Sequence, residues 1–377
     1  MKTVVYVDAY PLINNPQAGI GQYTRELITQ LAKLPDHKII LLLFESDRKN
    51  AVPTIPGTDI EYLPLHRRIY SLLWKFARPI NISRLLRHRN AKWIIYPNFG
   101  MTPFIHLQSA KTITVIHDLT FLHYPETVEK KNLFFLRKAV RYSTQRSDFL
   151  ITPSKYTARD LVDHYGVSED RVNISYPGYD HRQTKITSTP KRLSKIADTP
   201  FLLFLGTVEP RKNIAELCKA FLKLTNTTAP SLKLVVAGKR GWGRVSIPNV
   251  ESIVTLGSVS SEERAWLLES CYGFVFPSLF EGFGMPVMEA MRHKRPVVAS
   301  CASSLQEIVK KDNALIIPPP FKSEEIFQQL QRLIADHGTP AEQRRIHRAY
   351  EDSLKFTWEA SAQPFIELLE KPHTSGK

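Results

Sequence analysis

Short apolar runs alternate along this chain with longer stretches in which apolar residues recur at helical spacing. In the first half, strand-like runs at Val4–Val7 and Lys38–Phe44 flank a helical stretch from Gln22 to Leu34. Two parallel strands cannot be joined by a tight turn and are usually connected through a helix. The alternation therefore predicts an α/β fold with parallel sheets and crossover helices.

The second half repeats the same alternation. Its strand-like runs are 201–205, 232–237, 253–256, 273–276 and 296–299, and its helical stretches are 214–224 and a segment after Ser261. A length of 377 residues predicts two domains at roughly 150 residues each. The stretch from His181 to Thr199 is rich in Thr, Ser, Lys and Pro, which is typical of a linker. We expect an N-terminal domain at 1–190, a C-terminal domain at 191–355, and a helix at about 356–371 that packs back onto the first domain.

The chain is strongly basic, with 51 Lys and Arg against 36 Asp and Glu, and a net charge of +15. Such a balance favours partners that carry phosphate. The basic residues are densest from Arg67 to Lys92, where Leu, Trp and Phe lie between them at helical spacing. Two interpretations of this segment remain open, a helix with a solvated basic back or a surface that lies on anionic lipid. No nucleic-acid-binding motif accompanies the segment, so nucleic acid is not an expected partner.

Nothing in the sequence predicts export or a membrane-spanning helix. The first residues read as a strand that meets Asp8 before it reaches the length of a signal peptide, and no run approaches the about 18 apolar residues of a spanning helix. Cys218, Cys271 and Cys301 lack metal-ligand spacing, which is typical of buried thiols in a reducing compartment. We expect a cytoplasmic protein, with the basic segment as a peripheral contact to the inner face of the membrane.

The segment from Pro277 to Met291 places a glycine-containing turn between a strand and a helix, with carboxylates at Glu281 and Glu289. The turn follows a strand end, where ligands of open α/β sheets bind. The backbone amides of Phe283, Gly284 and Met285 would point at an anion, because the first turn of a helix leaves its N–H groups without helical partners. Two acidic residues alone are usually solvated charges, but this context favours a ligand site.

A second strand, turn and helix occurs at 205–213, where the turn contains Arg211 and Lys212. An adjacent basic pair is usually surface decoration, although this one also follows a strand end. Two cations together with backbone amides can offset the charge of a diphosphate. The sequence therefore predicts that these cations and the carboxylates of 277–291 converge on one ligand.

Two weaker signals lie in the first half. Gly19 and Gly21 fall in a loop before the first long helix and lack the full dinucleotide fingerprint, so the loop is either a plain turn or a place where a sugar or phosphate approaches the backbone. His117 and Asp118 end an apolar strand, and His117 is either a structural hydrogen-bond partner or a ligand contact. The sequence contains no Asp-x-Asp, His-x-x-x-His or Cys cluster, so no metal is expected.

At these residues the sequence resembles the retaining glycosyltransferases of family 4, which include many bacterial mannosyltransferases. Their Glu-x7-Glu motif matches at Glu281 and Glu289, with further matches at Gly19–Gly21, His117–Asp118 and Gly206–Asn213. The resemblance implies the GT-B fold, two Rossmann-like domains with the nucleotide-sugar donor in the cleft between them. One departure is Lys294, which stands in a tight turn where the family usually has Gly.

The resemblance also implies roles for the candidate residues. Glu281 would bind hydroxyls of the donor sugar, Glu289 the ribose, and Arg211 with Lys212 the diphosphate. The amides of Phe283, Gly284 and Met285 would contact donor sugar and phosphate. Gly19 and Gly21 would approach phosphate or acceptor, and His117, beside Asp118, would contact the sugar near the reacting carbon. The family generally works without a metal or other cofactor.

We therefore expect a retaining hexosyltransferase that transfers mannose from GDP-mannose to a lipid-linked or polysaccharide acceptor in cell-surface glycan synthesis. The mannose and guanine assignments follow from the resemblance alone. Two alternatives remain: a sugar-nucleotide epimerase of the same architecture, which would need a general acid and base, and a basic membrane or nucleic-acid binder without catalysis.

Overall fold

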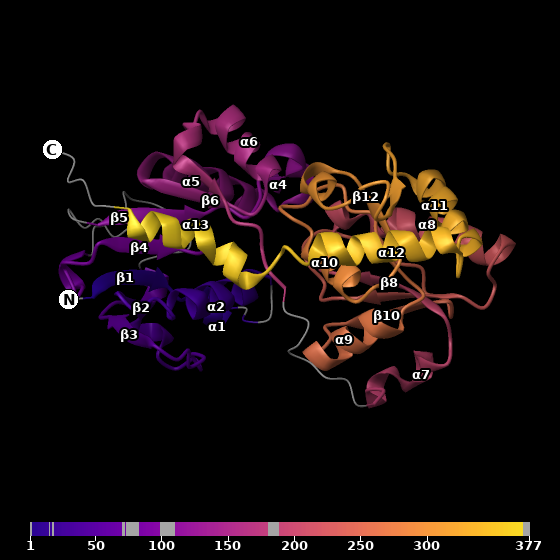
Figure 1. Cartoon of the computed structure of the whole chain (residues 1–377), viewed down its shortest axis with the longest axis horizontal. Helices are drawn as coiled ribbons and strands as arrows, with labels where there is room; N and C mark the ends of the chain where they lie inside the picture. Colours follow the sequence, from indigo (N-terminus) through magenta and orange to yellow (C-terminus); the bar gives the residue numbers. More distant parts are fainter. Residues whose placement is uncertain are drawn as a thin grey trace. The chain divides into compact units, whose positions relative to one another are not determined.

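A computed structural model of the chain describes residues 2–14, 16, 19–69, 72, 83–98, 110–179 and 188–371 (Figure 1). Residues 70, 71 and 73–82 of the basic segment 67–92, the first part of the expected linker and residues 17 and 18 lie outside these ranges. The chain forms two compact units. Unit 1 comprises Met1–Leu119, Lys131–Gly178 and Thr357–Lys377, and unit 2 comprises Thr120–Lys130 and Tyr179–Phe356.

Unit 1 contains a seven-stranded sheet in the order β3-β2-β1-β4-β5-β6-β7, and each neighbouring pair is parallel. The strands are β1 Thr3–Asp8, β2 His37–Phe44, β3 Thr58–Leu63, β4 Trp93–Tyr96, β5 Lys111–Val115, β6 Phe149–Thr152 and β7 Val172–Ile174. The helices are α1 Pro11–Asn14, α2 Gly19–Leu31, α5 Lys130–Arg146, α6 Lys155–Tyr165 and α13 Trp358–Glu370. Short 3₁₀ turns lie at Glu45–Asp47, Ser83–Leu85 and Glu169–Arg171.

Unit 2 contains a six-stranded parallel sheet in the order β10-β9-β8-β11-β12-β13. The strands are β8 Phe201–Leu205, β9 Lys233–Ala237, β10 Ile253–Gly257, β11 Gly273–Phe276, β12 Val297–Ser300 and β13 Leu315–Ile317. The helices are α4 Thr120–His123, α7 Ser194–Ala197, α8 Ile214–Thr227, α9 Ser261–Ser270, α10 Met285–Arg292, α11 Ser323–Ala335 and α12 Pro340–Ser353. Its 3₁₀ turns are Pro125–Thr127, Lys191–Leu193, Pro210–Lys212 and Ser303–Glu307.

The two central strands of unit 2 place the candidate site. Every residue of β8 and β11 is buried, as expected for strands of a parallel sheet covered on both faces. The chain runs from β8 outward through β9 and β10, and then from β11 outward in the other direction through β12 and β13. The strand order therefore reverses between β8 and β11, and ligands of such sheets bind at the carboxyl ends of the strands at this point.

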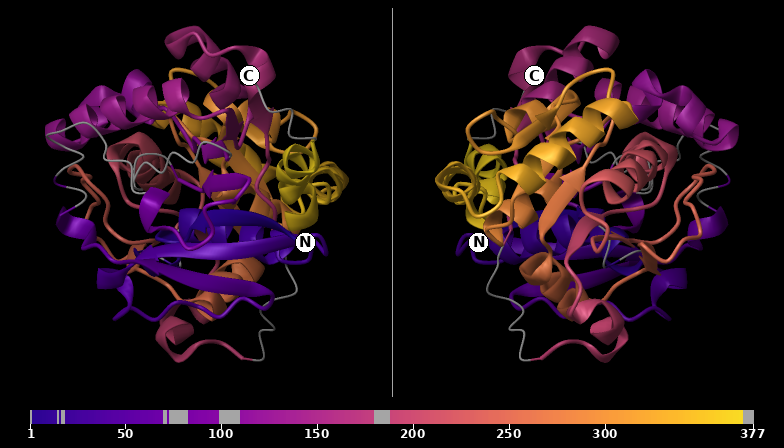
Figure 2. Two further views of the ribbon diagram at one scale, coloured as in Figure 1. Left: turned by 90° about the vertical axis from the view of Figure 1, so that its left-hand side faces the viewer. Right: turned by 90° about the vertical axis from the view of Figure 1, so that its right-hand side faces the viewer.

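The C-terminal helix α13 belongs to unit 1, and Figures 1 and 2 show it in yellow beside the indigo elements. It packs on α2, where Trp358 meets the ring of Tyr23 edge-on at 6.1 Å between centroids. Ser175 ties the two helices to the sheet, since its hydroxyl lies 3.1 Å from the Tyr23 hydroxyl and donates to the Ser361 carbonyl at 2.7 Å. A Cβ on Gly178 would lie 2.3 Å from the Trp358 nitrogen, so only glycine allows this approach.

The structure confirms the predicted α/β fold with parallel sheets, and the strands expected at 201–205 and 273–276 have those bounds. Helix α2 runs from Gly19 to Leu31 and not from Gln22 to Leu34, and α8 continues to Thr227 beyond the expected Leu224. Gly19 and Gly21 thus lie in the first turn of α2, where glycine is tolerated because the first N–H groups have no helical partner to lose. Cys218 and Cys271 are buried as expected, whereas Cys301 is partly exposed.

Lys294 follows the C-cap of α10 and lies in the left-handed backbone region, with φ of 54°. Its amide donates to the Met291 carbonyl at 3.0 Å and the Arg295 amide to the Ala290 carbonyl at 3.0 Å, which closes the helix end. A side chain in this conformation costs about 1 kcal/mol relative to glycine. The Lys294 ammonium lies over the Tyr350 ring, 4.6 Å from the ring centroid.

We predict that Lys294→Gly is more stable than Lys294→Ala by about 1 kcal/mol, because both variants lose the ring contact and only Gly removes the left-handed strain. Urea unfolding of the two proteins measures the difference. Equal free energies of unfolding would contradict the prediction.

Candidate active site

Two turns at the carboxyl ends of β8 and β11 form the candidate site. After β8 the chain passes through Gly206 into the 3₁₀ turn Pro210–Lys212. After β11 it passes through Ser278 and Glu281 to the start of α10. Because the strands are neighbours, the turns touch, and the Leu279 amide donates to the Arg211 carbonyl at 2.8 Å.

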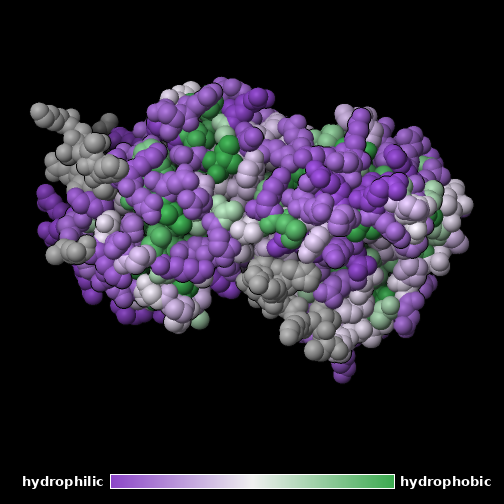
Figure 3. Space-filling model, in the orientation of Figure 1, coloured by the Kyte–Doolittle hydropathy of each residue, from purple (hydrophilic) through white to green (hydrophobic). Residues whose placement is uncertain are grey.

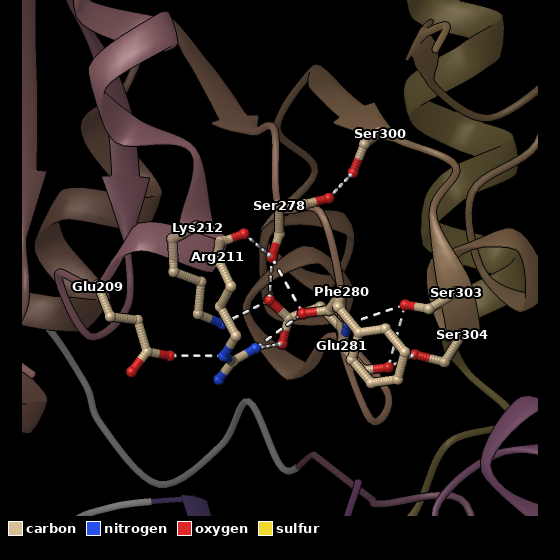
Figure 4. Close-up of polar contacts among 9 residues, drawn as sticks. All are labelled: Glu209, Arg211, Lys212, Ser278, Phe280, Glu281, Ser300, Ser303 and Ser304. Carbon is tan, nitrogen blue, oxygen red and sulfur yellow. Dashed lines mark hydrogen bonds and ion pairs between the residues drawn. The ribbon is translucent and has the colours of Figure 1, made fainter. Parts of the chain in front are cut away.

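Four charged side chains meet between these turns (Figure 4). The Lys212 Nζ lies 2.5 Å from Glu281 Oε1, and a guanidinium nitrogen of Arg211 lies 3.3 Å from Glu281 Oε2. On its other side Arg211 pairs with Glu209, with 2.7 Å between Nε and Oε1. Ser278 donates its hydroxyl to Glu281 Oε1 at 2.5 Å. The convergence of Arg211, Lys212 and Glu281 expected from the sequence is present.

Burial makes the pairing of these charges decisive. Glu209, Lys212 and Glu281 are 2%, 5% and 6% exposed. Burial and the nearby charge of Arg211 hold the pKa of Lys212 below its ordinary value, against the attraction of Glu281. Burial alone would raise the pKa of Glu281, but the charges of Lys212 and Arg211 and its hydrogen bonds hold that pKa below its ordinary value. The lowered pKa keeps Glu281 ionised at neutral pH, and for Lys212 the nearby carboxylate offsets part of the cost of burial.

The backbone of Glu281 is fixed from a neighbouring loop. Its amide donates to the Ser303 hydroxyl at 2.8 Å, and the hydroxyl of Ser304 donates to its carbonyl at 2.8 Å. Arg211 also donates to the Phe280 carbonyl at 2.7 Å. Side chain and backbone of Glu281 are thus both held before any ligand arrives, which is the preorganisation that a binding site requires.

The start of α10 adds a second feature to the site. Gly284 caps the helix with φ of 106°, and a Cβ there would lie 2.4 Å from a methyl of Leu305, so the position requires glycine. Within the described ranges, nothing accepts a hydrogen bond from the amides of Gly284 and Met285. Phe283 is buried, with its ring edge-on to Phe356. The helix start therefore presents amides that can donate hydrogen bonds to an anion.

Glu289, the second carboxylate that the sequence predicts to converge with these cations, forms no ion pair with Arg211 or Lys212. It is 1% exposed, and Arg264 of α9 donates to its Oε2 from Nε at 2.8 Å and from a terminal nitrogen at 2.6 Å. Burial raises the pKa of Glu289 above its ordinary value, and the charge of Arg264 opposes this. The two carboxylates of one segment thus have different cationic partners.

The four candidate residues of the first half all lie in unit 1. His117 Nε2 lies 2.8 Å from the Pro97 carbonyl oxygen, and its ring is edge-on to Tyr23 at 5.3 Å. Loss of solvent lowers the pKa of His117, while the carbonyl contact and the charge of Asp118 act in the opposite direction. The ring is therefore neutral at physiological pH. Gly19 and Gly21 lie in the first turn of α2.

Sequence reasoning missed Glu209, Ser278 and Arg264. The first two flank the predicted residues, and their roles depend on side-chain directions that spacing does not give. Arg264 has no local signal, because it follows the cap of a different helix. Among the residues with described placement, no group of three or more His, Cys, Asp or Glu side chains is arranged to hold a metal ion.

Two Rossmann-like units, with paired cations and carboxylates beside a helix start at the strand reversal of the second unit, match the architecture of the GT-B glycosyltransferases. The family model described as Glycosyltransferase Family 4 matches residues 18–183, and that described as Glycosyl transferases group 1 matches 185–352. The chain belongs to glycosyltransferase family 4, as the resemblance indicated.

Known proteins are similar to this chain in sequence, and solved structures are similar to it in fold. The O-antigen chain mannosyltransferase B of Escherichia coli is 27% identical over 323 residues, which cover 81% of this chain and 84% of that protein. Sucrose-phosphate synthase from Thermosynechococcus elongatus superposes with a TM-score of 0.73 at 18% identity, covering 98% of this chain and 99% of that one. Anabaena Alr3699/HepE in complex with UDP and glucose gives 0.71 at 17% identity, covering 99% and 100%.

We predict that Lys212→Met lowers the free energy of unfolding of unit 2 by about 2 kcal/mol, because it leaves Glu281 buried with one cation fewer. Adding Glu281→Gln should cost less than the sum of the single changes, since the residues are in contact. A double-mutant cycle by urea unfolding measures this coupling.

The coupling should depend on pH in one direction. The pKa of Glu281 in the folded protein lies below its ordinary value. The contribution of Glu281 to the free energy of unfolding is therefore complete at pH values above its pKa in the unfolded chain, and it is lost as the pH falls through its pKa in the folded protein. Additive mutations at neutral pH would contradict the predicted pair.

Proposed function

We propose that the protein is a retaining hexosyltransferase that moves mannose from GDP-mannose onto a lipid-linked or polysaccharide acceptor in cell-surface glycan synthesis, without a metal. The observation that carries the proposal is the buried cluster of Arg211, Lys212 and Glu281 beside the capped start of α10. Cations, free amides and a fixed carboxylate lie within one small region, as recognition of a phosphorylated sugar requires.

Each residue has a distinct part in this proposal. Arg211, Lys212 and the amides of Phe283, Gly284 and Met285 stabilise the departing diphosphate, so that the charge developing on it is met by groups already in place. Glu281 accepts hydrogen bonds from donor-sugar hydroxyls, and Glu289 from the ribose. Same-face attack assisted by the leaving phosphate retains configuration and requires no carboxylate nucleophile.

The candidate residues of unit 1 serve the sugar and the acceptor. Neutral His117 contacts the sugar near the reacting carbon, and its contact with Pro97 fixes the ring. Asp118 adds negative charge beside it. Gly19 and Gly21 let phosphate or acceptor approach the first turn of α2, where amides lack helical partners.

The names of the relatives support the class of donor. O-antigen chain mannosyltransferase B of Escherichia coli supports mannose and a glycan acceptor, and the complex of Anabaena HepE with UDP and glucose supports a nucleotide-linked donor. The printed names differ in the sugar, which is mannose for the first protein and glucose for the second.

We predict turnover with GDP-mannose in a panel of GDP- and UDP-linked hexoses, measured as donor hydrolysis and as transfer to lipid-linked saccharide. Glu281→Ala should lower kcat at least about 100-fold, because it removes a ligand contact and leaves Lys212 buried without its closest carboxylate. Excess EDTA should leave the rate unchanged. Arg332→Ala, an exposed ion-pair change on α11, is the control.

The outcomes separate the alternatives. Interconversion of donors without transfer would favour the epimerase. No turnover with any donor, together with salt-sensitive binding of nucleic acid, would favour a non-catalytic binder.

We also propose that the protein lies in the cytoplasm and binds peripherally to an anionic membrane surface. Within the described part of the chain, no helix is long and apolar enough to span a bilayer, and hydrophilic residues dominate the face in Figure 3. On α5, Phe134 is 73% exposed, and the exposed Arg137 and Arg141 follow at helical spacing on the same face. An apolar ring with nearby cations suits the boundary of an anionic bilayer.

We predict that Phe134→Ser combined with Arg137→Gln and Arg141→Gln weakens binding to vesicles of phosphatidylglycerol and phosphatidylcholine by about tenfold or more, since each surface cation contributes about 1 kcal/mol. Co-sedimentation measures the binding. Leu354→Ser with Arg332→Gln and Arg348→Gln makes matched changes at exposed positions of unit 2. Equal losses in both triple variants would refute a docking face on α5.

A further inference from the structure

Arg264 holds only one of the two oxygens of Glu289. Both guanidinium contacts, at 2.8 Å from Nε and 2.6 Å from a terminal nitrogen, end on Oε2. Among the residues that the structure describes, no group donates to Oε1. The carboxylate is thus fixed through one oxygen, while the other keeps its capacity to accept hydrogen bonds.

The pair spans two helices that each have a well-defined start. On α9, the Ser260 hydroxyl accepts from the Glu263 amide, and the Glu263 carboxylate accepts from the Ser260 amide. Arg264 follows directly, and its own amide donates to the Ser260 carbonyl at 2.8 Å. The cap therefore sets the direction from which Arg264 reaches Glu289 on α10.

A buried carboxylate with a single ion-pair partner depends on that partner for its charge. Glu289 is 1% exposed, and Arg264, with a side chain 37% exposed, is its ion-pair partner. Three other charged or titratable groups lie near the Tyr179 phenol. They are Glu269 of α9, Arg292 of α10, and His293, whose Nε2 lies 2.8 Å from the phenol oxygen and whose Nδ1 lies 3.8 Å from Glu269. Tyr179 itself is neutral, because burial, followed by the charge of Glu289, raises its pKa well above the ordinary range.

We infer that Arg264 is a positioning residue for the nucleotide ribose, holding Glu289 through Oε2 so that Oε1 accepts from a ribose hydroxyl. This inference rests on the proposed function, which gives Glu289 to the ribose. Arg264 acts through the carboxylate and needs no contact with the ligand. Without Arg264, Glu289 loses both its orientation and the charge that opposes protonation in a buried place.

The test measures by calorimetry how tightly the full chain binds GDP and 2′,3′-dideoxy-GDP. UDP and 2′,3′-dideoxy-UDP form a second pair of ligands. Arg264→Met should weaken GDP binding roughly tenfold, the size expected for a hydrogen bond to a charged group. The dideoxy compound should bind wild type and Arg264→Met alike, because it has no hydroxyl for Glu289. Arg264→Lys should restore part of the loss, and Arg332→Ala should change neither affinity.

A pH profile distinguishes positioning from loss of structure. Burial already raises the pKa of Glu289, and removing Arg264 removes the opposing charge, so the pKa should rise further. GDP affinity of Arg264→Met should then fall at a higher pH than that of wild type, and the gap should narrow as pH rises. A folding defect would lower the affinity for GDP and for dideoxy-GDP equally at every pH.

Glu289→Gln separates failure of this inference from failure of the proposed function. The role of Arg264 is refuted, and that of Glu289 stands, if Glu289→Gln weakens GDP binding but Arg264→Met does not. The same conclusion follows if Arg264→Met weakens the binding of GDP and of dideoxy-GDP equally. If Glu289→Gln leaves binding of GDP and UDP unchanged, the ribose assignment itself is wrong. No binding of either nucleotide by wild type overturns the proposed function.

Discussion

The pair of Lys212 and Glu281 is the constraint on which the site depends. Each side chain is almost fully buried, and 2.5 Å separates the ammonium from the nearer carboxylate oxygen. A charge removed from water costs several kcal/mol unless an opposite charge and further hydrogen bonds compensate it. The pair can form only because β8 and β11 are neighbours with their carboxyl ends together. The strand order of unit 2 therefore determines where its cations lie.

The same pairing sets the terms on which an anion can bind. Glu209, Arg211, Lys212 and Glu281 sum to zero charge when all are ionised. A diphosphate that bound to the two cations would share them with two carboxylates, so their attraction would be weaker than that of two unpaired cations. The amides of Gly284 and Met285 carry no such competition, because no described group accepts from them. On the proposed function, the helix start thus contributes attraction that the neutral cluster does not.

Much of this arrangement could be predicted from the sequence. The alternation of strands and helices gave the α/β fold, and strand ends at Leu205 and Phe276 indicated that Arg211, Lys212 and Glu281 would meet. The partner of Glu289 could not be predicted, because Arg264 reaches it across the packing of two helices that no local pattern specifies. The start of α2 was missed for a different reason, since glycine favours neither a loop nor a first helical turn strongly enough to decide between them. The ligand roles of all these residues stay predictions.

The two carboxylates of one motif show how different surroundings shift the pKa of identical groups in opposite directions. Cations and hydrogen bonds hold the pKa of Glu281 below its ordinary value, whereas burial holds that of Glu289 above it. Glu281 has cations on both oxygens and a serine hydroxyl besides, so its charge is secure over the physiological range. Among the described residues, Glu289 has one cation on one oxygen, so its charge depends on the side chain of Arg264 from another helix. A segment that the sequence presents as a symmetric pair of acids therefore contains one carboxylate held by two cations and one whose charge depends on Arg264. On the proposed function, the second carboxylate is where residues outside the motif can adjust ligand binding.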